Sequence, residues 1–438
     1  MNIRIGIFSA LVFLTFQTTA QQRLTVEDVV VRALEKGYDV QLSRNTLLSA
    51  QTDAKNAVGL FLPDLSLNGT RNFSDQDSRQ TLANDSVVVR PGVKQNALNG
   101  GVQLNWVLFD GLKMFATYKG LQQVAGVNEV LLKNQMANTM SSVIGSYYSI
   151  VAQEQQLKAI NEQISVGEER VKLAERRLQV GSGAKTELLQ ARLDQNAFKT
   201  LALQQQAQIL QTKATLNQST GMDLPDEFAV ADTIPLNLDL TIDEIMEGIE
   251  SSNPALIAAR GNVEVARYQL NARRGDKLPV VSFISNYNFN RNESNVATSP
   301  FAPKAQRNTT LSYGLTAQWT LLNNFVVKNA VELAKINWQR TQLIYEQQRA
   351  VALTGVKVAY ANYDNARKTL AIEEENILFA RENVTIMLES FRRGIATFIE
   401  LRTAQQSAVD AYNRLTTARY NAKVSETELL RLKGALLR

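Results

Sequence analysis

The sequence of 438 residues contains no cysteine and no histidine. Without cysteine the chain has no disulfide, no thiolate metal ligand, no thiol nucleophile and no residue for a lipoprotein anchor. Without histidine it lacks the commonest general base near neutral pH and the commonest transition-metal ligand. Carboxylates and lysines remain, but the sequence shows no convergent carboxylate pair and no nucleophile with a neighbouring base. We therefore expect no enzyme, with no catalytic residue, no metal site and no cofactor.

Blocks of like charge are also missing. The formal net charge of +5 would permit a nucleic-acid partner, but Lys and Arg alternate with Asp and Glu along the whole chain. Because no basic segment stands alone, we expect no binding to nucleic acid.

Apolar runs long enough to span a membrane as a helix are absent. The longest apolar run lies at the N-terminus. One positive charge, Arg4, precedes an apolar run over residues 5–16, and small residues follow up to Ala20. This pattern predicts a secretory signal peptide over residues 1–20, cleaved before Gln21. About a dozen apolar residues are too few for a spanning helix, which needs about 20.

Proline is scarce and unevenly placed. Only eight prolines occur, none between positions 92 and 224 and none after Pro303. Long proline-free segments rich in Ala, Leu, Gln, Glu, Lys and Arg favour helix. At about 1.5 Å per residue, residues 111–180 would form a rod of roughly 100 Å.

The same unit occurs twice. Landmarks of the first half recur in the second half in the same order, at a spacing that shortens once, between the Leu-Pro and Trp landmarks, and is otherwise constant. The matched pairs are 24–28 with 240–244, Leu62-Pro63 with Leu278-Pro279, Trp106 with Trp319, Gly181 with Gly394, Glu187 with Glu400, Ala191 with Ala404 and Gly221 with Gly434. We therefore assign residues 21–222 to repeat 1, the proline-containing segment 223–239 to a linker, and residues 240–438 to repeat 2.

The proline-free segments have apolar residues at alternating spacings of three and four. The series are Leu157, Ile160, Ile164, Gly167, Val171, Ala174 and Leu178 in repeat 1, and Leu370, Ile377, Ala380, Val384, Met387 and Phe391 in repeat 2. A repeat of this length predicts coiled-coil packing. An ordinary cytosolic coiled coil would have the same pattern.

Each repeat also contains a predicted β-hairpin, over residues 62–109 and 278–322, with alternating apolar and polar residues. One face carries the aromatic residues Phe73, Trp106, Tyr287, Tyr313 and Trp319, whereas the other is rich in Asn, Gln, Ser and Thr. We expect four strands of about ten residues and irregular loops over residues 74–97 and 291–308. A soluble antiparallel sheet could alternate in this way. The scarcity of charge on the polar face and the strand length favour a membrane sheet.

Four strands cannot close a membrane barrel, because single-chain barrels begin at about eight strands. An open sheet edge is not tolerated in lipid, since its backbone groups would lack hydrogen-bond partners. A membrane sheet of this size would therefore require several copies, and three copies would supply about twelve strands.

In this arrangement the chain resembles the TolC-type outer-membrane efflux proteins. The resemblance covers essentially the whole mature chain. It is carried by LTVEDVVVRAL and LTIDEIMEGI at the start of each repeat, the Leu-Pro pairs, WVLFDG at 106–111, VGSGAKTELLQA at 180–191 and RGIATFIELRTA at 393–404. Each motif alone is weak evidence for this family, but their occurrence twice in the same order is specific to it.

The resemblance implies a mixed α and β membrane protein. Three protomers would form a 12-stranded β-barrel in the outer membrane of a Gram-negative bacterium, where the barrel would contact the membrane lipid. A long α-helical coiled-coil tunnel would continue the barrel into the periplasm. The homotrimer would be a passive exit duct for small molecules, including drugs, or for type I secreted proteins. An inner-membrane pump would deliver the cargo through a periplasmic adaptor, or membrane fusion, protein. The alternative is a periplasmic coiled-coil adaptor or scaffold without a barrel.

The resemblance places adaptor contacts at the tips of both helical hairpins. The residues concerned are Gly181, Ser182, Gly183, Gly394, Ala396 and Thr397. Glycine is needed where the backbone reverses sharply, so the two matched glycines could also serve only to end their helices.

The resemblance also places a periplasmic aperture on the helix after the second tip, at Glu400 and Thr403. Three copies of Glu400 would form a carboxylate ring that attracts cations. Thr403 stands where the family often has a second Asp, which weakens the expected cation preference. The alternative is that Glu400 is an ordinary exposed residue on the helix surface, which is the more common role of a helical Glu. Glu187 and Phe391 match the region where neighbouring hairpins are clamped. Phe391 replaces a Tyr and continues the apolar repeat, so core packing is its safer role.

Overall fold

The computed structural model describes residues 23–225, 227–297 and 303–436. The predicted signal peptide and its cleavage point lie outside these residues. The chain divides into two compact units. The first, here called the helical unit, comprises residues 23–42, 133–253 and 352–436; the second, here called the sheet unit, comprises residues 43–132 and 254–351. Among the described residues, no helix combines the length and apolar character needed to cross a membrane.

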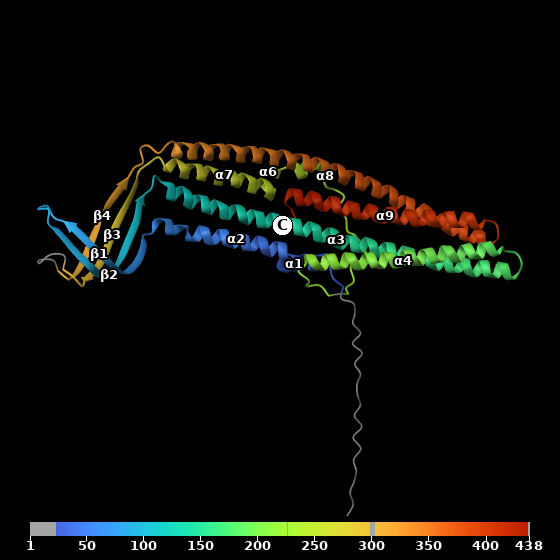
Figure 1. Ribbon diagram of the computed structural model, residues 1–438. Coiled ribbons are helices and arrows are strands. Elements are labelled where there is room, and N and C mark those ends of the chain that lie inside the picture. Colours follow the sequence, from blue (N-terminus) through green and yellow to red (C-terminus); the bar gives the residue numbers. More distant parts are fainter. Residues whose placement is uncertain (1–22, 226, 298–302, 437–438) are drawn as a thin grey trace, which may run out of the picture. The chain divides into compact units, whose positions relative to one another are not determined.

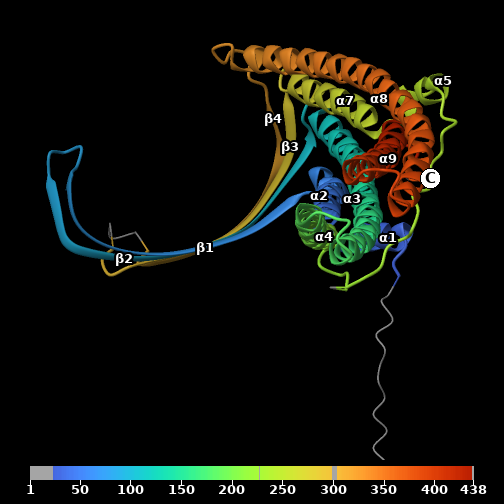
Figure 2. The same ribbon diagram turned by 90° about the vertical axis from the view of Figure 1, so that its right-hand side faces the viewer.

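The sheet unit contains one antiparallel sheet in the order β1-β2-β3-β4 (Figure 1). The strands are β1 (Asp64–Thr81), β2 (Val87–Phe109), β3 (Val280–Ser294) and β4 (Ala305–Gln318). The sheet is curved, and the β1–β2 hairpin extends well beyond β3 and β4 (Figure 2). Among the residues that the structure describes, β1 and β4 each have a neighbouring strand on one side only, so both outer edges are open.

The pairing of the strands aligns their alternating side chains into two distinct faces. Leu67, Val102, Tyr287 and Leu311 form one row, and Leu65, Leu104, Ser285 and Tyr313 form the next row on the same face. The opposite face carries the rows Ser66, Gln103, Asn286, Ser312; Asn68, Gly101, Asn288, Thr310; and Thr70, Asn99, Asn290, Asn308. The predicted apolar and polar faces are therefore confirmed, and these three polar rows contain no charge.

The expectation of an irregular loop over residues 74–97 was wrong. β1 continues to Thr81 and β2 begins at Val87, because ladder hydrogen bonds need only the backbone and not an alternating sequence. Pro91 lies at an irregularity in the pairing between Gln76 and Ser78, where a proline without an N–H is tolerated. The second predicted loop, 291–308, is likewise shorter, because β3 ends at Ser294 and β4 begins at 305.

The remaining elements are helical. They are α1 (Val26–Lys36), α2 (Tyr38–Asn56), the 3₁₀ helix η1 (Ala57–Phe61), α3 (Lys113–Gln179), α4 (Lys185–Ser219), α5 (Ile242–Met246), α6 (Ile249–Ser252), α7 (Pro254–Gly275), α8 (Val326–Arg392) and α9 (Phe398–Lys433). The segments that the apolar series predicted to be long helices, in α3 and α8, are each one continuous helix.

Both repeats begin with the same capping box. The Thr25 hydroxyl accepts the Asp28 N–H, and the Asp28 carboxylate accepts the Thr25 N–H. Thr241 and Glu244 form the same pair of hydrogen bonds at the start of repeat 2. The matched opening motifs are therefore two copies of one helix start.

Four long helices of the helical unit lie side by side in the order α4, α3, α9, α8. The contacts that establish this order are Gln153 with Thr212 at 3.1 Å, Gln156 with Asn413 at 2.9 Å, and Arg414 with Glu373 at 3.1 Å. The α3–α4 and α8–α9 hairpins each reverse at a short tip (Figure 1). Helices α4 and α8 are thus the outer members, just as β1 and β4 are the outer strands.

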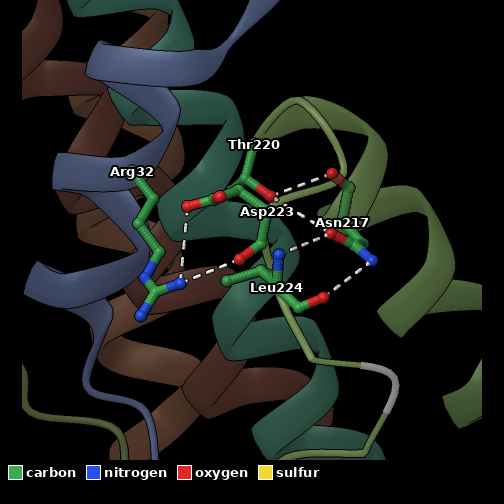
Figure 3. A network of polar contacts seen from close by, with 5 residues as sticks. All are labelled: Arg32, Asn217, Thr220, Asp223 and Leu224. Atoms are coloured by element: carbon green, nitrogen blue, oxygen red, sulfur yellow. Dashed lines mark hydrogen bonds and ion pairs between the residues drawn. The ribbon is translucent and has the colours of Figure 1, made fainter.

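The described residues of the predicted linker form neither a helix nor a strand, and hydrogen bonds connect the start of this segment to α1 and α4. At its start, the Arg32 guanidinium of α1 donates to the Asp223 carbonyl at 2.8 Å (Figure 3). The amide of Asn217, at the end of α4, accepts the Leu224 N–H and donates to the Leu224 carbonyl (Figure 3). The hydroxyl of the buried Thr220 donates to the Asn217 carbonyl at 2.8 Å. These contacts tie the junction of repeat 1 and linker to the first helix.

Candidate functional site

The two hairpin tips contain the same turn. The N–H of Gly181 donates to the Leu178 carbonyl, and the N–H of Ser182 donates to the Arg177 carbonyl. At the matching positions of the second tip, Gly394 and Ile395 donate in the same way to Phe391 and Ser390. Gly181 has a φ of +77° and Gly394 a φ of +74°, the left-handed conformation that ends a helix in this motif. Both predicted tip glycines are therefore required by the backbone.

The helices that follow the two tips begin differently. Helix α9 starts with a capping box, in which the Thr397 hydroxyl accepts the Glu400 N–H and the Glu400 Oε2 accepts the Thr397 N–H at 2.7 Å. Helix α4 has Ala184 at the matching N-cap, with no side-chain hydrogen bond, although Glu187 is again three residues on. The Thr-x-x-Glu spacing at 397–400 was the local sequence signal for this cap.

The capping box also determines the electrostatics of Glu400. Hydrogen bonds from the Thr397 N–H, and then from its hydroxyl, lower the pKa of the Glu400 carboxyl below its ordinary value of 4.5. The carboxylate is therefore ionised near neutral pH and remains exposed. The hydroxyl of Thr403, also exposed, donates to the Ile399 carbonyl of its own helix at 3.0 Å.

Phe391 lies in the core between the two tips. Its side chain is 2% exposed and packs edge-on against Phe398 at 6.5 Å between ring centroids. The Arg177 guanidinium of the first tip lies 5.0 Å from the Phe391 ring. An arginine over an aromatic face contributes roughly 0.5–2 kcal/mol. Phe391 therefore joins the two tips by packing, the role that its place in the apolar repeat favoured.

A buried polar cluster lies between the two hairpins behind the tips. Arg170 of α3 is 3% exposed and donates to the Gln405 Oε1 of α9 at 2.5 Å and to the Asp194 Oδ2 of α4 at 3.1 Å. Arg402 of α9 reaches the same Asp194 oxygen at 3.1 Å. The Arg170 guanidinium also lies 4.5 Å from the Phe398 ring. One carboxylate thus holds two guanidiniums that come from different hairpins.

Burial dominates the electrostatics of this cluster. It lowers the pKa of the Arg170 guanidinium, and the hydrogen bond to Asp194 opposes that shift. The Arg170 Nε and the Gln405 Nε2 have no hydrogen-bond partner among the described residues. A cluster of this kind holds a defined geometry, because any displacement leaves a buried charge uncompensated.

We did not identify this cluster from the sequence, although a signal was present. Gln163, Arg170 and Arg177 follow one another at intervals of seven, next to the predicted apolar series. Polar residues flanking a coiled-coil seam are the ones that form contacts between helices. The sequence does not show that one of their partners lies on a helix of the other repeat.

The structure places the other predicted residues as follows. Gly181, Ser182, Gly394 and Thr397 are exposed, whereas Gly183, Ala396 and Glu187 are half-buried. All of them lie on the two tips or on the first turn that follows.

The predicted membrane-facing aromatic residues share the apolar side of the sheet. Phe73, Trp106, Tyr287, Tyr313 and Trp319 are 40% to 75% exposed, and Trp319 lies one residue past β4. The indole N–H of Trp106 donates to the Phe61 carbonyl, and that of Trp319 donates to the Lys277 carbonyl. Each acceptor directly precedes a Leu-Pro pair, so the duplicated landmarks contact each other in both repeats.

Comparison with known proteins gives a consistent result. Residues 29–222 and 246–435 match the sequence profile of a family described as outer membrane efflux protein. The outer membrane efflux protein BepC of Brucella suis biovar 1 (strain 1330) is 22% identical over 343 residues, which are 77% of this chain and 72% of that protein. The outer membrane protein TolC of Salmonella enteritidis is 19% identical over 79% of this chain and 70% of that protein.

Among solved structures, the Campylobacter jejuni CmeC outer membrane channel superposes with a TM-score of 0.78. It is 15% identical, and the superposition covers 99% of this chain and 94% of that one. At this identity the likeness shows the fold.

Proposed function

This chain belongs to the outer membrane efflux protein family, and from that premise we propose how copies of it assemble into an exit duct. Membership of the family confirms the predicted TolC-type resemblance, the outer-membrane location and the role in efflux or secretion.

One observation supports the assembly. In the described residues of a single chain, the outer strands and the outer long helices each have surfaces that no neighbouring element covers. In the sheet these are the open edges of β1 and β4. In the helical layer, α8 exposes an apolar residue at almost every seventh position: Ile344, Val351, Val358, Ile372, Phe379 and Ile386. Helix α4 exposes Leu189, Leu203 and Leu210, also at multiples of seven. Exposed stripes of this kind are coiled-coil seams without a partner.

A ring of identical copies would give the outer strands and the outer helices a neighbour at the same time. Helix α8 of one copy would pack on α4 of the next, and β4 of one copy would pair with β1 of the next. Three copies would close a barrel of about twelve strands, which leaves no edge in lipid. The apolar face would contact the lipid, and the uncharged amide and hydroxyl rows would line a water-filled lumen. A periplasmic scaffold without a barrel would not account for this apolar face.

The aperture of the duct would lie at the second tip. Glu400 is exposed and ionised, so three copies would form a ring of carboxylates that favours cations. Thr403 adds no charge, and Phe391 and Glu187 would support the tip. The exposed tip residues Gly181, Ser182, Gly394 and Thr397, with the half-buried Gly183 and Ala396, would contact a periplasmic adaptor, which links the duct to an inner-membrane pump. The duct itself performs no chemistry.

The assembly is tested with a charge placed in the α8 stripe. The mature protein is purified in detergent and its mass is measured, with a trimer expected. Val358, 55% exposed in the single chain, becomes buried in the ring, so Val358→Glu should abolish the trimer. Lys357→Glu, about 100° around the same helix, is the control and should leave it intact. A wild-type protein that remains a soluble monomer without detergent contradicts the proposal.

The aperture is tested separately by planar-bilayer conductance. Glu400→Gln should lower the selectivity for cations, whereas Glu375→Gln, at an exposed position on α8 away from the tips, should not. An unchanged selectivity in Glu400→Gln removes this residue from the constriction but leaves the duct in place.

A further inference from the structure

Three arginines form a row across the apolar face of the sheet. The strand pairing places Arg71 of β1, Leu98 of β2, Arg291 of β3 and Arg307 of β4 side by side. Arg291 lies four residues from Tyr287 on β3, and strand side chains repeat every two residues, so the row belongs to the apolar face.

The row lies at one end of the apolar band. On β2 the band runs from Leu98 to Leu108, beyond which the chain enters α3 at Lys113. About ten residues are roughly 33 Å along a strand, or roughly 25 Å along the membrane normal at a tilt of about 40°. This height matches the apolar band of outer-membrane barrels. The arginines therefore lie where acyl chains give way to headgroups, at the end of the apolar band remote from Lys113.

Two of these arginines face each other directly. Arg291 and Arg307 are partners in the β3–β4 ladder. Like charges directly opposite each other on neighbouring strands are destabilising. The Arg291 Nε donates to the Glu293 carboxylate at 2.9 Å, which neutralises only one of the two guanidiniums.

Arg307 and the third arginine, Arg71, each lie over an aromatic ring. The guanidinium of Arg307 lies 5.1 Å from the Phe289 ring, and that of Arg71 lies 4.8 Å from the Phe73 ring. The Arg71 Nε donates to the Asn96 side chain at 3.1 Å. Within the described parts of the chain, neither Arg71 nor Arg307 forms an ion pair. The row therefore keeps two uncompensated positive charges at the edge of an apolar surface.

We propose that this row binds the phosphate group of a membrane lipid, with the phosphate between Arg291 and Arg307. A guanidinium matches phosphate oxygens with two parallel N–H donors, and an anion between the two arginines removes their repulsion. The acyl chains of the same lipid would cover Leu311 and Tyr313, which are 63% and 75% exposed in the rows that follow on β4. A free phosphate ion would satisfy the charges but leave this surface bare. The inference needs the sheet to lie in the membrane, and it goes beyond the duct function.

The test compares lipids that differ only in the phosphate. Purified protein in a neutral detergent is titrated with dioleoyl phosphatidic acid, and bound lipid is counted by native mass spectrometry. Dioleoyl glycerol supplies the same chains without the phosphate, and inorganic phosphate supplies the anion without the chains. We expect phosphatidic acid to bind, dioleoyl glycerol not to bind, and millimolar inorganic phosphate to displace little of the lipid.

The variants assign the binding to the row. Arg291→Gln combined with Arg307→Gln should raise the apparent dissociation constant about tenfold or more, since each contact is a charge-assisted hydrogen bond. Lysine at both positions keeps the charge but loses the planar fork, so it should recover part of the affinity. Arg79→Gln, on β1 beyond the row, is the matched control and should change the affinity less than about twofold.

Three results would overturn the proposal: equal binding of dioleoyl glycerol, full displacement by inorganic phosphate, or an unchanged dissociation constant in the double variant. The mass of each variant in detergent reports assembly separately, so loss of the trimer is distinguished from loss of the lipid. If the double variant does not assemble, Arg307→Gln alone serves as the test, because Arg307 has no ion pair in the described chain to lose.

Discussion

The two hairpin tips share one backbone and differ in their side chains. Both reverse through the same left-handed glycine and the same pair of hydrogen bonds. The first tip contributes Arg177 to the contact between them, whereas the second contributes Phe391 and a capped helix start at Thr397. Duplication thus preserved the turn, which the backbone requires, and left the surrounding residues free to diverge.

This difference suggests a division of roles. The second tip carries the fixed carboxylate of Glu400 and a helix start that is held by its own cap. The first tip lacks this cap and is held instead by Arg170 and Arg177, which reach across to the second hairpin. The first tip therefore depends on its neighbour. Four experiments test this difference between the tips.

The largest effect is expected from Asp194→Asn, which removes the carboxylate shared by Arg170 and Arg402. Breaking a buried ion pair leaves an uncompensated charge and costs about 3–5 kcal/mol. Hydrogen exchange of the amides near the tips should show both hairpins opening more readily. Asp410→Asn, an exposed carboxylate on α9, is the control and should cost less than about 0.5 kcal/mol. Protection lost in one hairpin alone would mean that the cluster does not couple the tips.

A smaller and equal effect is expected at the two turn glycines. Gly181→Ala and Gly394→Ala both force a side chain into the left-handed conformation, at a cost of about 1–2 kcal/mol. A Cβ on Gly181 would meet no atom within 4 Å, so its cost is conformational. Thermal unfolding of the two variants in detergent should give similar shifts. Clearly unequal shifts would show that the two turns are not equivalent.

The cap is the feature that differs, and it can be exchanged. Thr397→Ala should destabilise the start of α9 by about 1 kcal/mol, and Ala184→Thr should stabilise α4 by a similar amount. Ala184 already has the required extended backbone, with φ −87° and ψ 142°. Rates of proteolytic cleavage at each tip provide the measurement. If Ala184→Thr does not slow cleavage at the first tip, the missing cap is not what distinguishes the two.

The smallest effect is expected from pH. The pKa of Glu400 is lowered in the folded protein, so its stabilising contribution is complete above 4.5 and is lost as the pH falls through the lowered value. The protection of amides at the start of α9, measured as the exchange rate relative to the intrinsic rate at the same pH, should fall in this acidic range. Thr397→Ala removes the hydroxyl that helps to lower the pKa and should weaken this dependence. An identical pH profile in the variant would contradict the assignment.

Local patterns in the sequence determined much of this protein. Proline placement and apolar spacing predicted helices α3 and α8, and the period of two predicted the two faces of the sheet. The repeated landmarks predicted both tip turns. These features depend on neighbours within a few residues, so a single sequence contains the information.

The tertiary structure decided the features whose partners lie far apart. The polar segments that follow Phe73 and precede Leu98 form strands because they pair with each other, although they lack the apolar–polar alternation typical of a strand. Arg170 meets Gln405 across two hairpins, and Arg291 meets Arg307 only through the register of β3 and β4. Periodicity shows which face a side chain occupies, but backbone pairing and helix packing decide what lies opposite it.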